Sequence, residues 1–261
     1  MKEENGVAWW IENGLGRVEL RRSEKANALD VQTSRALAKA IHDILDSNPK
    51  VIMLTSAGRI FCAGGDIQEF CSAGDKLDHV VDNILESLNP AIARLAKSET
   101  VVISVVSGAL GGAGIGLALC SDFVLASTEM KLRTGYASIG LSPDAGSSYF
   151  LARRIGGQKA KQWFLLNESM DARTCLHNGA VDALHAPEEL MSQAELLAKK
   201  LLSGSRGAHA AIKRLCDSAA TNPLNDHLVL EHGLIRHQAM NADAREGINS
   251  YLSKRSADFK S

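Results

Sequence analysis

The 261-residue chain carries 29 Lys and Arg residues against 30 Asp and Glu residues, for a formal net charge of −1. This balance gives no reason to expect nucleic acid or an anionic membrane as a partner. The cysteines form no CxxC pair, the N-terminus has no apolar run typical of a secretory signal, and no apolar stretch is long enough to cross a membrane. We therefore expect free thiols and a cytoplasmic protein.

Apolar strands and amphipathic helices alternate along the first two thirds of the chain. Asn13-Gly14 is a typical hairpin turn, and Asp30 stands where the N-cap of the first helix is expected. We expect a hairpin over residues 7–22, a helix over 30–46 and a strand over 51–58. A second helix is expected over 76–97, a strand over 101–106 and short strands over 122–134. A further helix begins near Ser148, and from about Pro187 the pattern is mainly helical. This order predicts an α/β unit followed by a helical segment.

Two glycine-rich segments each follow an apolar strand: AGGD at 63–66 and GGAGIG at 111–116. Glycines let a backbone approach a ligand closely, and a helix that begins at Gly112–Gly114 would direct unpaired N–H groups towards it. If the two loops face one another, they can offer two N–H donors to one oxygen, as in an oxyanion hole. The alternative is that the glycines serve only tight turns and close packing. Neither GxGxxG nor a P-loop is present, so no nucleotide phosphate is expected.

Asp144 has two competing interpretations. It lies in SPDAGSS, where it is either a catalytic carboxylate or the N-cap of the following helix.

Three histidines raise the question of a metal site. His227, His232 and His237 are five residues apart, so each side chain is rotated by about 140° from the one before it on a helix. The three cannot share one face, so we expect no metal site.

The segments FCAGGDIQEF, GALGGAGIGLALCSDFVLAS and IGLSPDAGSSYFLARRIG, in this order and separation, resemble the enoyl-CoA hydratase/isomerase (crotonase) superfamily. The resemblance continues upstream through RRSEKANALD and downstream through DAREGINSYLSKR. It implies a crotonase-like spiral of strand-strand-helix turns over residues 1–198 and a C-terminal helical trimerisation segment over 199–261. It also implies an acyl-CoA thioester as substrate, no separate cofactor because coenzyme A belongs to the substrate, and a homotrimer or a dimer of trimers.

The resemblance assigns roles to individual residues. It places the oxyanion-hole N–H groups on Gly65 and Ala113. Positions that match the family's substrate contacts are Lys25, Ala26, Ala28, Ala63, Asp66, Ile67, Leu110, Gly112 and Tyr136. For Asp66, the GGDI context also favours a structural role, in which it orients the loop that presents Gly65.

The hydratases of this superfamily use two glutamates, which would fall on Gly116 and Tyr136, and neither position carries a carboxylate. Asp144 falls where single-acid relatives, the Δ3,Δ2-enoyl-CoA isomerases and ring-epoxide isomerases, carry their acid/base. The 4-chlorobenzoyl-CoA dehalogenases resemble this stretch too, but their partner histidine would fall near Asn89. The resemblance therefore predicts an acyl-CoA isomerase with Asp144 as its single acid/base. The alternatives are a hydratase or other acyl-CoA lyase, and a non-catalytic acyl-CoA-binding subunit.

Overall fold

The N-terminal hairpin forms as the sequence predicts. In the computed structural model, which describes residues 1–260, β2 (Val7–Glu12) pairs antiparallel with β3 (Leu15–Leu20). Asn13 and Gly14 have φ values of 51° and 80°, and this positive φ at both central positions is what a type I′ hairpin turn requires. A short strand not expected from the sequence, β1 (Lys2–Glu4), extends the hairpin at its edge.

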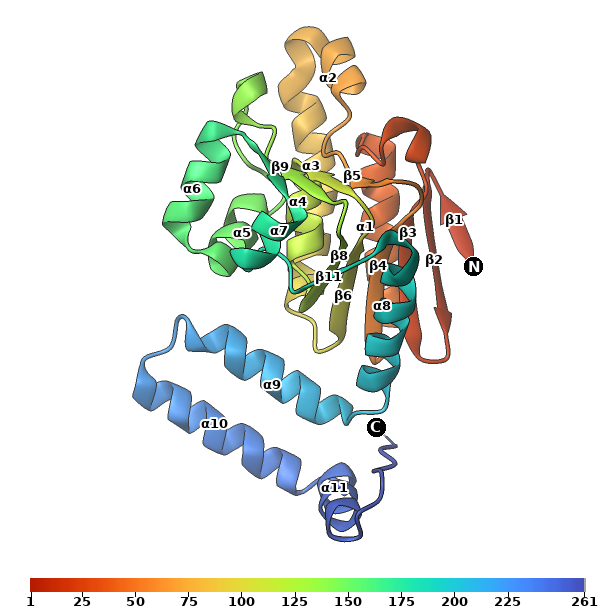
Figure 1. The fold of residues 1–261 in the computed structure, drawn as a ribbon, viewed down its shortest axis with the longest axis vertical. Coiled ribbons are helices and arrows are strands. Elements are labelled where there is room, and N and C mark those ends of the chain that lie inside the picture. Colours follow the sequence, from red (N-terminus) through yellow and green to blue (C-terminus); the bar gives the residue numbers. More distant parts are fainter. Residues whose placement is uncertain (261) are drawn as a thin grey trace.

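The larger sheet has seven strands in the order β1-β2-β3-β4-β6-β8-β11 (Figure 1). Its remaining strands are β4 (Val51–Ser56), β6 (Val101–Val106), β8 (Phe123–Ser127) and β11 (Ala183–His185). From β3 to β11 every neighbouring pair is parallel, so helices form the crossovers. All six residues of β6 are buried, which explains its uninterrupted apolar sequence.

The smaller sheet brings the two glycine-rich segments together. Its four strands have the order β10-β9-β7-β5, with bounds Ser169–Asp171, Lys131–Arg133, Ala109–Gly111 and Ile60–Cys62. Strands β5 and β7 are parallel neighbours. AGGD begins at the residue that directly follows β5, and GGAGIG begins with the last residue of β7. Because the carboxyl ends of parallel neighbours lie at the same edge, both loops leave the sheet side by side.

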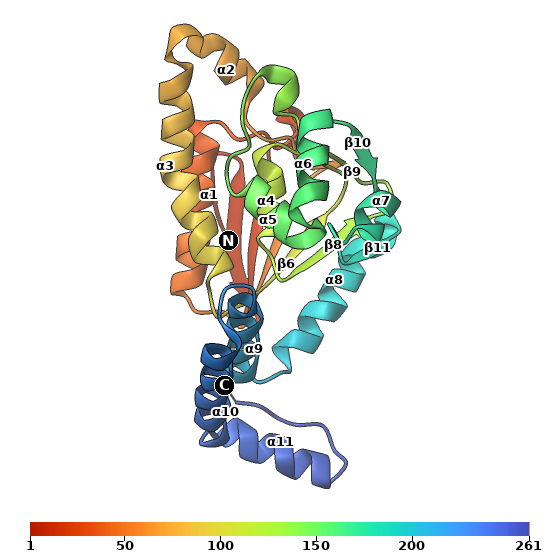
Figure 2. The same cartoon turned by 90° about the vertical axis from the view of Figure 1, so that its left-hand side faces the viewer.

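Helices cover both faces of the larger sheet (Figures 1 and 2). The helices are α1 (Val31–Asp46), α2 (Ile67–Ala73), α3 (Leu77–Ala96), α4 (Ala113–Leu119), α5 (Ser147–Ile155), α6 (Gly157–Leu166), α7 (Ala172–His177), α8 (Pro187–Leu202), α9 (Arg206–Ala219), α10 (Leu224–Ala239) and α11 (Ala242–Leu252). Short 3-10 turns span Ser23–Lys25 (η1), Gly74–Lys76 (η2) and Ala137–Ile139 (η3).

The apolar faces of α1 and α3 join the main core, and α8 packs on the opposite face through Leu190, Ala194 and Ala198. The Asp30 carboxylate caps α1 by accepting from the Thr33 N–H at 2.8 Å, as predicted.

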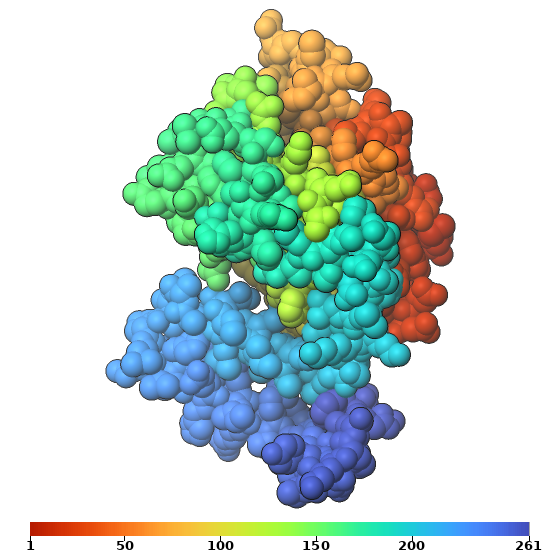
Figure 3. Space-filling view, viewed as in Figure 1, coloured from red at the N-terminus to blue at the C-terminus, as the bar shows by residue number. Residues whose placement is uncertain are grey.

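Helices α9 to α11 form an arm that projects from the core (Figures 1 and 3). The bend between α8 and α9 falls at residues 203–205, a few residues after the boundary that the sequence analysis set at 199, and the division into two units stays a prediction. Helices α9 and α10 bury no residue. The large apolar side chains that the arm exposes are Ile212, Leu224, Leu228, Val229, Ile235, Met240, Ile248, Tyr251 and Leu252. None of the helices within residues 1–260 combines the length and the apolar character that a bilayer span requires.

Candidate active site

The two glycine loops touch each other through their backbones. A Cβ on Gly64 would lie 2.9 Å from the Cα of Gly112 and 3.3 Å from the nitrogen of Ala113. Gly64 has φ +97° and Gly112 has φ +50°, conformations that side chains disfavour. Glycine is therefore required at both positions, for conformation and for space. This close approach meets the condition that the sequence analysis set for an oxyanion hole, namely that the two loops face one another.

Each loop holds one unpaired main-chain amide next to the contact. Neither the N–H of Gly65 nor that of Ala113 donates to another group of residues 1–260. Ala113 is the first residue of α4, where an N–H has no partner within its own helix. The structure thus places both candidate oxyanion donors at adjoining loops and leaves both free to donate.

Asp144 lies beside these loops, and Tyr136 holds its carboxylate. The Tyr136 hydroxyl donates to Asp144 Oδ1 at 2.6 Å. Burial raises the pKa of the Asp144 carboxyl above its ordinary value, and hydrogen bonds from Tyr136 and from its own main-chain N–H oppose this effect. Burial and the nearby Asp144 charge also raise the pKa of Tyr136 well above its usual range, so Tyr136 stays neutral and remains a donor.

Ser147 links Asp144 to the second glycine loop, residues 111–116 (the candidate oxyanion loop). Its side chain is fully buried, and its Oγ lies 3.1 Å from the Tyr136 hydroxyl. The same Oγ donates to the Gly112 carbonyl at 3.0 Å and accepts from the Gly116 N–H at 3.2 Å. Helix α5 begins at Ser147 with Gly146 as its N-cap and no capping side chain, so the alternative role of Asp144 as N-cap is not what the structure shows.

The position where hydratases carry their first glutamate has no room for a side chain. A Cβ on Gly116 would lie 1.9 Å from the carbonyl oxygen of Ala145 and 2.9 Å from the nitrogen of Ser147. The loop that carries Asp144, residues 140–146 (the acid loop), therefore packs directly on α4, and glycine is the residue that permits this contact. At the second glutamate position, Tyr136 turns its hydroxyl to Asp144.

A cavity of about 1160 Å³ extends from the acid loop to the arm. Among the residues that line it are Asn89 and Ile92 of α3, Leu119 of α4, Phe150 of α5 and Ile212 of α9, together with Asp144. Two other carboxylates reach it. Asp122 accepts from Lys213 of α9 at 2.7 Å, and Asp217 lies 3.8 Å from Arg153. Both are therefore paired with cations, whereas within residues 1–260 the only side-chain partner of Asp144 is a neutral hydroxyl.

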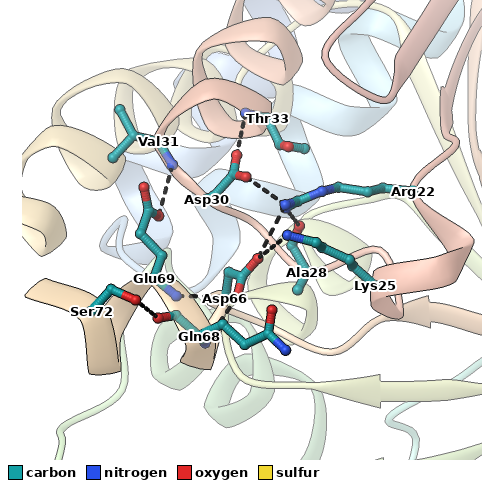
Figure 4. Close-up of polar contacts among 10 residues, drawn as sticks. All are labelled: Arg22, Lys25, Ala28, Asp30, Val31, Thr33, Asp66, Gln68, Glu69 and Ser72. Carbon is teal, nitrogen blue, oxygen red and sulfur yellow. Dashed lines mark hydrogen bonds and ion pairs between the residues drawn. The ribbon is translucent and has the colours of Figure 1, made fainter.

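Figure 4 shows how Arg22 fixes the segment that precedes α1 to the first glycine loop. Its guanidinium lies 2.6 Å from Asp30 Oδ2 and 3.1 Å from Asp66 Oδ2, and it donates to the Ala28 carbonyl at 3.1 Å. Asp66 also caps α2 by accepting from the N–H groups of Gln68 and Glu69. Its buried carboxylate thus has a structural use, as the GGDI context indicates.

Most of the other candidate substrate contacts lie on two neighbouring segments, residues 26–29 and 63–66, or directly beside them. Residues 26–29 and 63–66 run side by side, because Ala63 donates to the Ala26 carbonyl at 3.1 Å and Leu29 donates to the Gly64 carbonyl at 2.8 Å. Lys25 and Ile67 are exposed at the two ends of this pair of segments. Leu110 is buried in the main core, with 1% of its surface exposed.

We expect replacement of Arg22 by Gln to lower the free energy of unfolding by about 3 kcal/mol, because it leaves the buried Asp66 carboxylate with Lys25 at 3.9 Å as its remaining cation. Urea denaturation measures the loss. Arg21→Gln is the matched control: Arg21 pairs with the more exposed Glu19 and Glu3 at the edge of the sheet, where a loss below about 1 kcal/mol is expected. Equal losses in the two variants would show that the Arg22 contacts have no special importance.

Sequence reasoning did not identify Ser147 or Arg22, although both lie within quoted segments. Ser147 is 35 residues from the Gly112 carbonyl it contacts, and Arg22 is far in sequence from Asp66. No local pattern signals such contacts, because they depend on how distant loops meet.

In residues 1–260, no group of three His, Cys, Asp or Glu side chains is arranged to hold a metal ion.

Comparisons with known proteins identify the family of this chain. The family model described as enoyl-CoA hydratase/isomerase matches residues 10–261. The chain is 32% identical over 252 residues to a 1,2-epoxyphenylacetyl-CoA isomerase from Escherichia coli, covering 95% of this chain and 96% of that one. It is 30% identical to a protein of Rhodobacter capsulatus named "Probable enoyl-CoA hydratase", covering 97% of each. The crystal structure of an enoyl-CoA hydratase from Polaromonas sp. JS666 superposes with a TM-score of 0.90 at 28% identity, covering 97% of this chain and 99% of that one.

These matches span nearly the whole chain and confirm the crotonase-like α/β fold that the resemblance implied. Relatives named as isomerases and relatives named as hydratases occur together among them. The chain therefore belongs to the enoyl-CoA hydratase/isomerase family, whose enzymes act on acyl-CoA thioesters.

Proposed function

We propose that this protein is an acyl-CoA isomerase that shifts a double bond through a thioester enolate, with Asp144 as its single acid/base. The observation that carries the proposal is the hydrogen-bonded connection of Asp144, through Tyr136 and Ser147, to a loop with a free main-chain amide. Within the described residues, this carboxylate has no cation as partner. The packing of Gly116 against Ala145 supports it, because a second carboxylate has no space there.

In the proposed mechanism, the thioester oxygen of a 3-enoyl-CoA lies between the N–H groups of Gly65 and Ala113. The bond between carbon 2 and its hydrogen breaks, and negative charge develops on that oxygen. Fixed donors stabilise this charge without reorganising, and each contributes roughly 3 kcal/mol in known oxyanion holes. The two adjoining loops thus lower the barrier to enolate formation.

The proton moves by way of Asp144. Tyr136 occupies Oδ1, which leaves Oδ2 free to take the proton from carbon 2 and return it to carbon 4, so that the double bond ends between carbons 2 and 3. The proton is transferred and not consumed, so one carboxylate is sufficient. A pKa raised by burial helps one group to act first as base and then as acid.

The experiment offers 3-enoyl-CoA and 2-enoyl-CoA to the purified protein and follows the ultraviolet absorbance of the conjugated thioester. Isomerisation of the first substrate makes the absorbance rise. Loss of absorbance with the second substrate, and no rise with the first, would instead indicate a hydratase whose water is held by Tyr136 and Asp144. Tight binding without turnover of either substrate would indicate an acyl-CoA-binding subunit.

The raised pKa of Asp144 predicts a pH-dependent effect on stability. Between the pKa of an unfolded aspartate, about 4, and the higher folded value, the folded protein holds a proton that the unfolded chain has released. The free energy of unfolding therefore falls as pH rises through this interval. Asp144→Asn removes the dependence, so we expect the variant to gain stability relative to wild type from pH 4 upwards. Urea denaturation at a series of pH values measures the difference, and parallel curves would contradict it.

We further propose that the arm assembles the chain into a homotrimer or a dimer of trimers. The support is the exposed apolar surface of the arm, since contiguous exposed apolar surface marks sites of association. Sedimentation velocity is expected to show a trimer or hexamer. Replacement of Leu228 and Ile235 of α10 by Glu is expected to yield smaller species, and an unchanged sedimentation coefficient would place the interface elsewhere.

A further inference from the structure

The Gly112 carbonyl and the Ala113 N–H belong to the same peptide unit. The structure holds no cis peptide bond among the described residues, and a trans peptide is planar, with its C=O and N–H directed to opposite sides. Whatever fixes the direction of the Gly112 carbonyl therefore fixes the direction of the Ala113 N–H. Two donors hold this carbonyl: the Ile115 N–H at 3.0 Å and the Ser147 hydroxyl at 3.0 Å.

The Ile115 contact lies within the first turn of α4, so the loop makes it regardless of the acid loop. The Ser147 contact comes from α5 and is the one that ties this peptide to the acid loop. A hydrogen bond accepted by a carbonyl also polarises its peptide and strengthens the N–H at the other end as a donor. Ser147 is thus placed to affect both the direction and the strength of the Ala113 donor.

The hydrogens of the three hydroxyl contacts can be counted. Tyr136 has one hydrogen and uses it on Asp144 Oδ1 at 2.6 Å. Ser147 has one hydrogen and two acceptors within reach, the Gly112 carbonyl at 3.0 Å and the Tyr136 hydroxyl at 3.1 Å. The Gly116 N–H occupies an acceptor position on Ser147. The Ser147 hydrogen is therefore shared between the oxyanion loop and the tyrosine that holds the acid.

We infer that Ser147 is a positioning residue that sets the Ala113 N–H as an oxyanion donor and couples this donor, through Tyr136, to the acid at position 144. The inference rests on the proposed use of the Ala113 amide as an oxyanion donor. It predicts different results for two substitutions that are close in space. Ser147→Ala removes a donor from the Gly112 carbonyl and weakens the Ala113 N–H, whereas Tyr136→Phe leaves the Ser147 hydrogen entirely to that carbonyl.

The experiment measures the carbonyl stretch of butyryl-CoA carrying ¹³C at the thioester carbon, bound to the full-length protein, by infrared difference spectroscopy. Butyryl-CoA is saturated and cannot isomerise, so the band reports the oxyanion donors alone. Wild type is expected to shift the band to lower frequency than in free butyryl-CoA. Ser147→Ala is expected to reduce this shift by a fifth or more, in line with a cooperative contribution on the order of 10–30% per bond. Tyr136→Phe is expected to keep the full shift.

Two further variants complete the test. Ser34→Ala is the matched control, because Ser34 is equally buried and its hydroxyl has no partner among residues 1–260, so its band should match wild type. Ser147→Cys keeps a weak donor and should fall between wild type and Ser147→Ala, which also serves if the alanine variant fails to fold. In turnover, Ser147→Ala should lower kcat about tenfold, part of what the loss of a whole oxyanion donor costs, with KM little changed.

A wild-type band shift in Ser147→Ala would overturn the inference, whatever happens to the thermal stability of the variant. Equal reductions in Ser147→Ala and Tyr136→Phe would overturn it as well, because they would trace the effect to the acid loop as a whole. Failure of the proposed isomerase reaction is seen separately, since the band position does not depend on turnover.

Discussion

Asp144→Asn is expected to lower kcat for the conversion of 3-enoyl-CoA to 2-enoyl-CoA by about a thousandfold, within the range that general acid–base catalysis contributes. The amide is nearly the same size and still accepts a hydrogen bond from Tyr136 through its oxygen, so the loop should stay in place. It cannot take a proton from carbon 2. The rate of increase in absorbance of the conjugated thioester measures the effect.

The control for this variant is substrate binding. KM for 3-enoyl-CoA should change little, because the proposed donors to the thioester oxygen are main-chain groups that the substitution does not touch. Asp144→Glu should recover part of the rate, since the carboxylate is retained but displaced by one methylene. Turnover by Asp144→Asn at the wild-type rate would remove Asp144 from the mechanism and require another base.

Gly64→Ala is expected to lower kcat by about a hundredfold, near the loss caused by removal of one oxyanion donor. Its Cβ would lie 2.9 Å from the Cα of Gly112, so the two loops must move apart, and the φ of +97° adds backbone strain. Because the amides of Gly65 and Ala113 are adjacent to this contact, separation of the loops misplaces both donors. Steady-state kinetics on 3-enoyl-CoA measures the change.

Gly74→Ala is the matched control for Gly64→Ala. Gly74 also has a positive φ, +53°, but a Cβ there would meet nothing within 4 Å. The control therefore carries the backbone strain without the steric contact, and its kcat should equal that of wild type while its stability falls slightly. If both variants lost activity to the same extent, strain in the chain and not the separation of the loops would be responsible.

Local patterns were sufficient for the longer strands and helices. The Asn13-Gly14 turn, the Asp30 cap and the uninterrupted apolar run of β6 each follow from the chemistry of a few adjacent residues. Helix α3 at Leu77–Ala96 agrees within one residue with the predicted 76–97, even though Pro90 lies inside it, because the spacing of apolar residues extends on both sides. Strand β1 was missed because its three residues are exposed and charged, with no apolar pattern to detect.

In the candidate site, too, some features could be predicted from local sequence and others could not. The glycine segments and Asp144 could be found in the sequence because glycine content and a carboxylate in a glycine-rich loop are visible locally. The role of Asp144 stayed ambiguous between acid and N-cap, since both use the same residue type at a helix start. The structure decides whether Asp144 is the cap, because α5 begins at Ser147 with Gly146 as its N-cap and no capping side chain. The Asp144 carboxylate accepts instead from the Tyr136 hydroxyl at 2.6 Å.

By itself, the sequence determined where the longer strands and helices form, where the glycine loops lie, and which carboxylate stands in the acid loop. Each of these depends on residues close together in the chain. Only the tertiary structure decided that Gly64 touches Gly112, that Arg22 reaches Asp66 and that Ser147 joins the acid to the Gly112 carbonyl. The physical reason is that hydrogen bonds and van der Waals contacts act over a few ångströms, and only the packing of β5, β7, α4 and α5 brings residues this distant in sequence within that range.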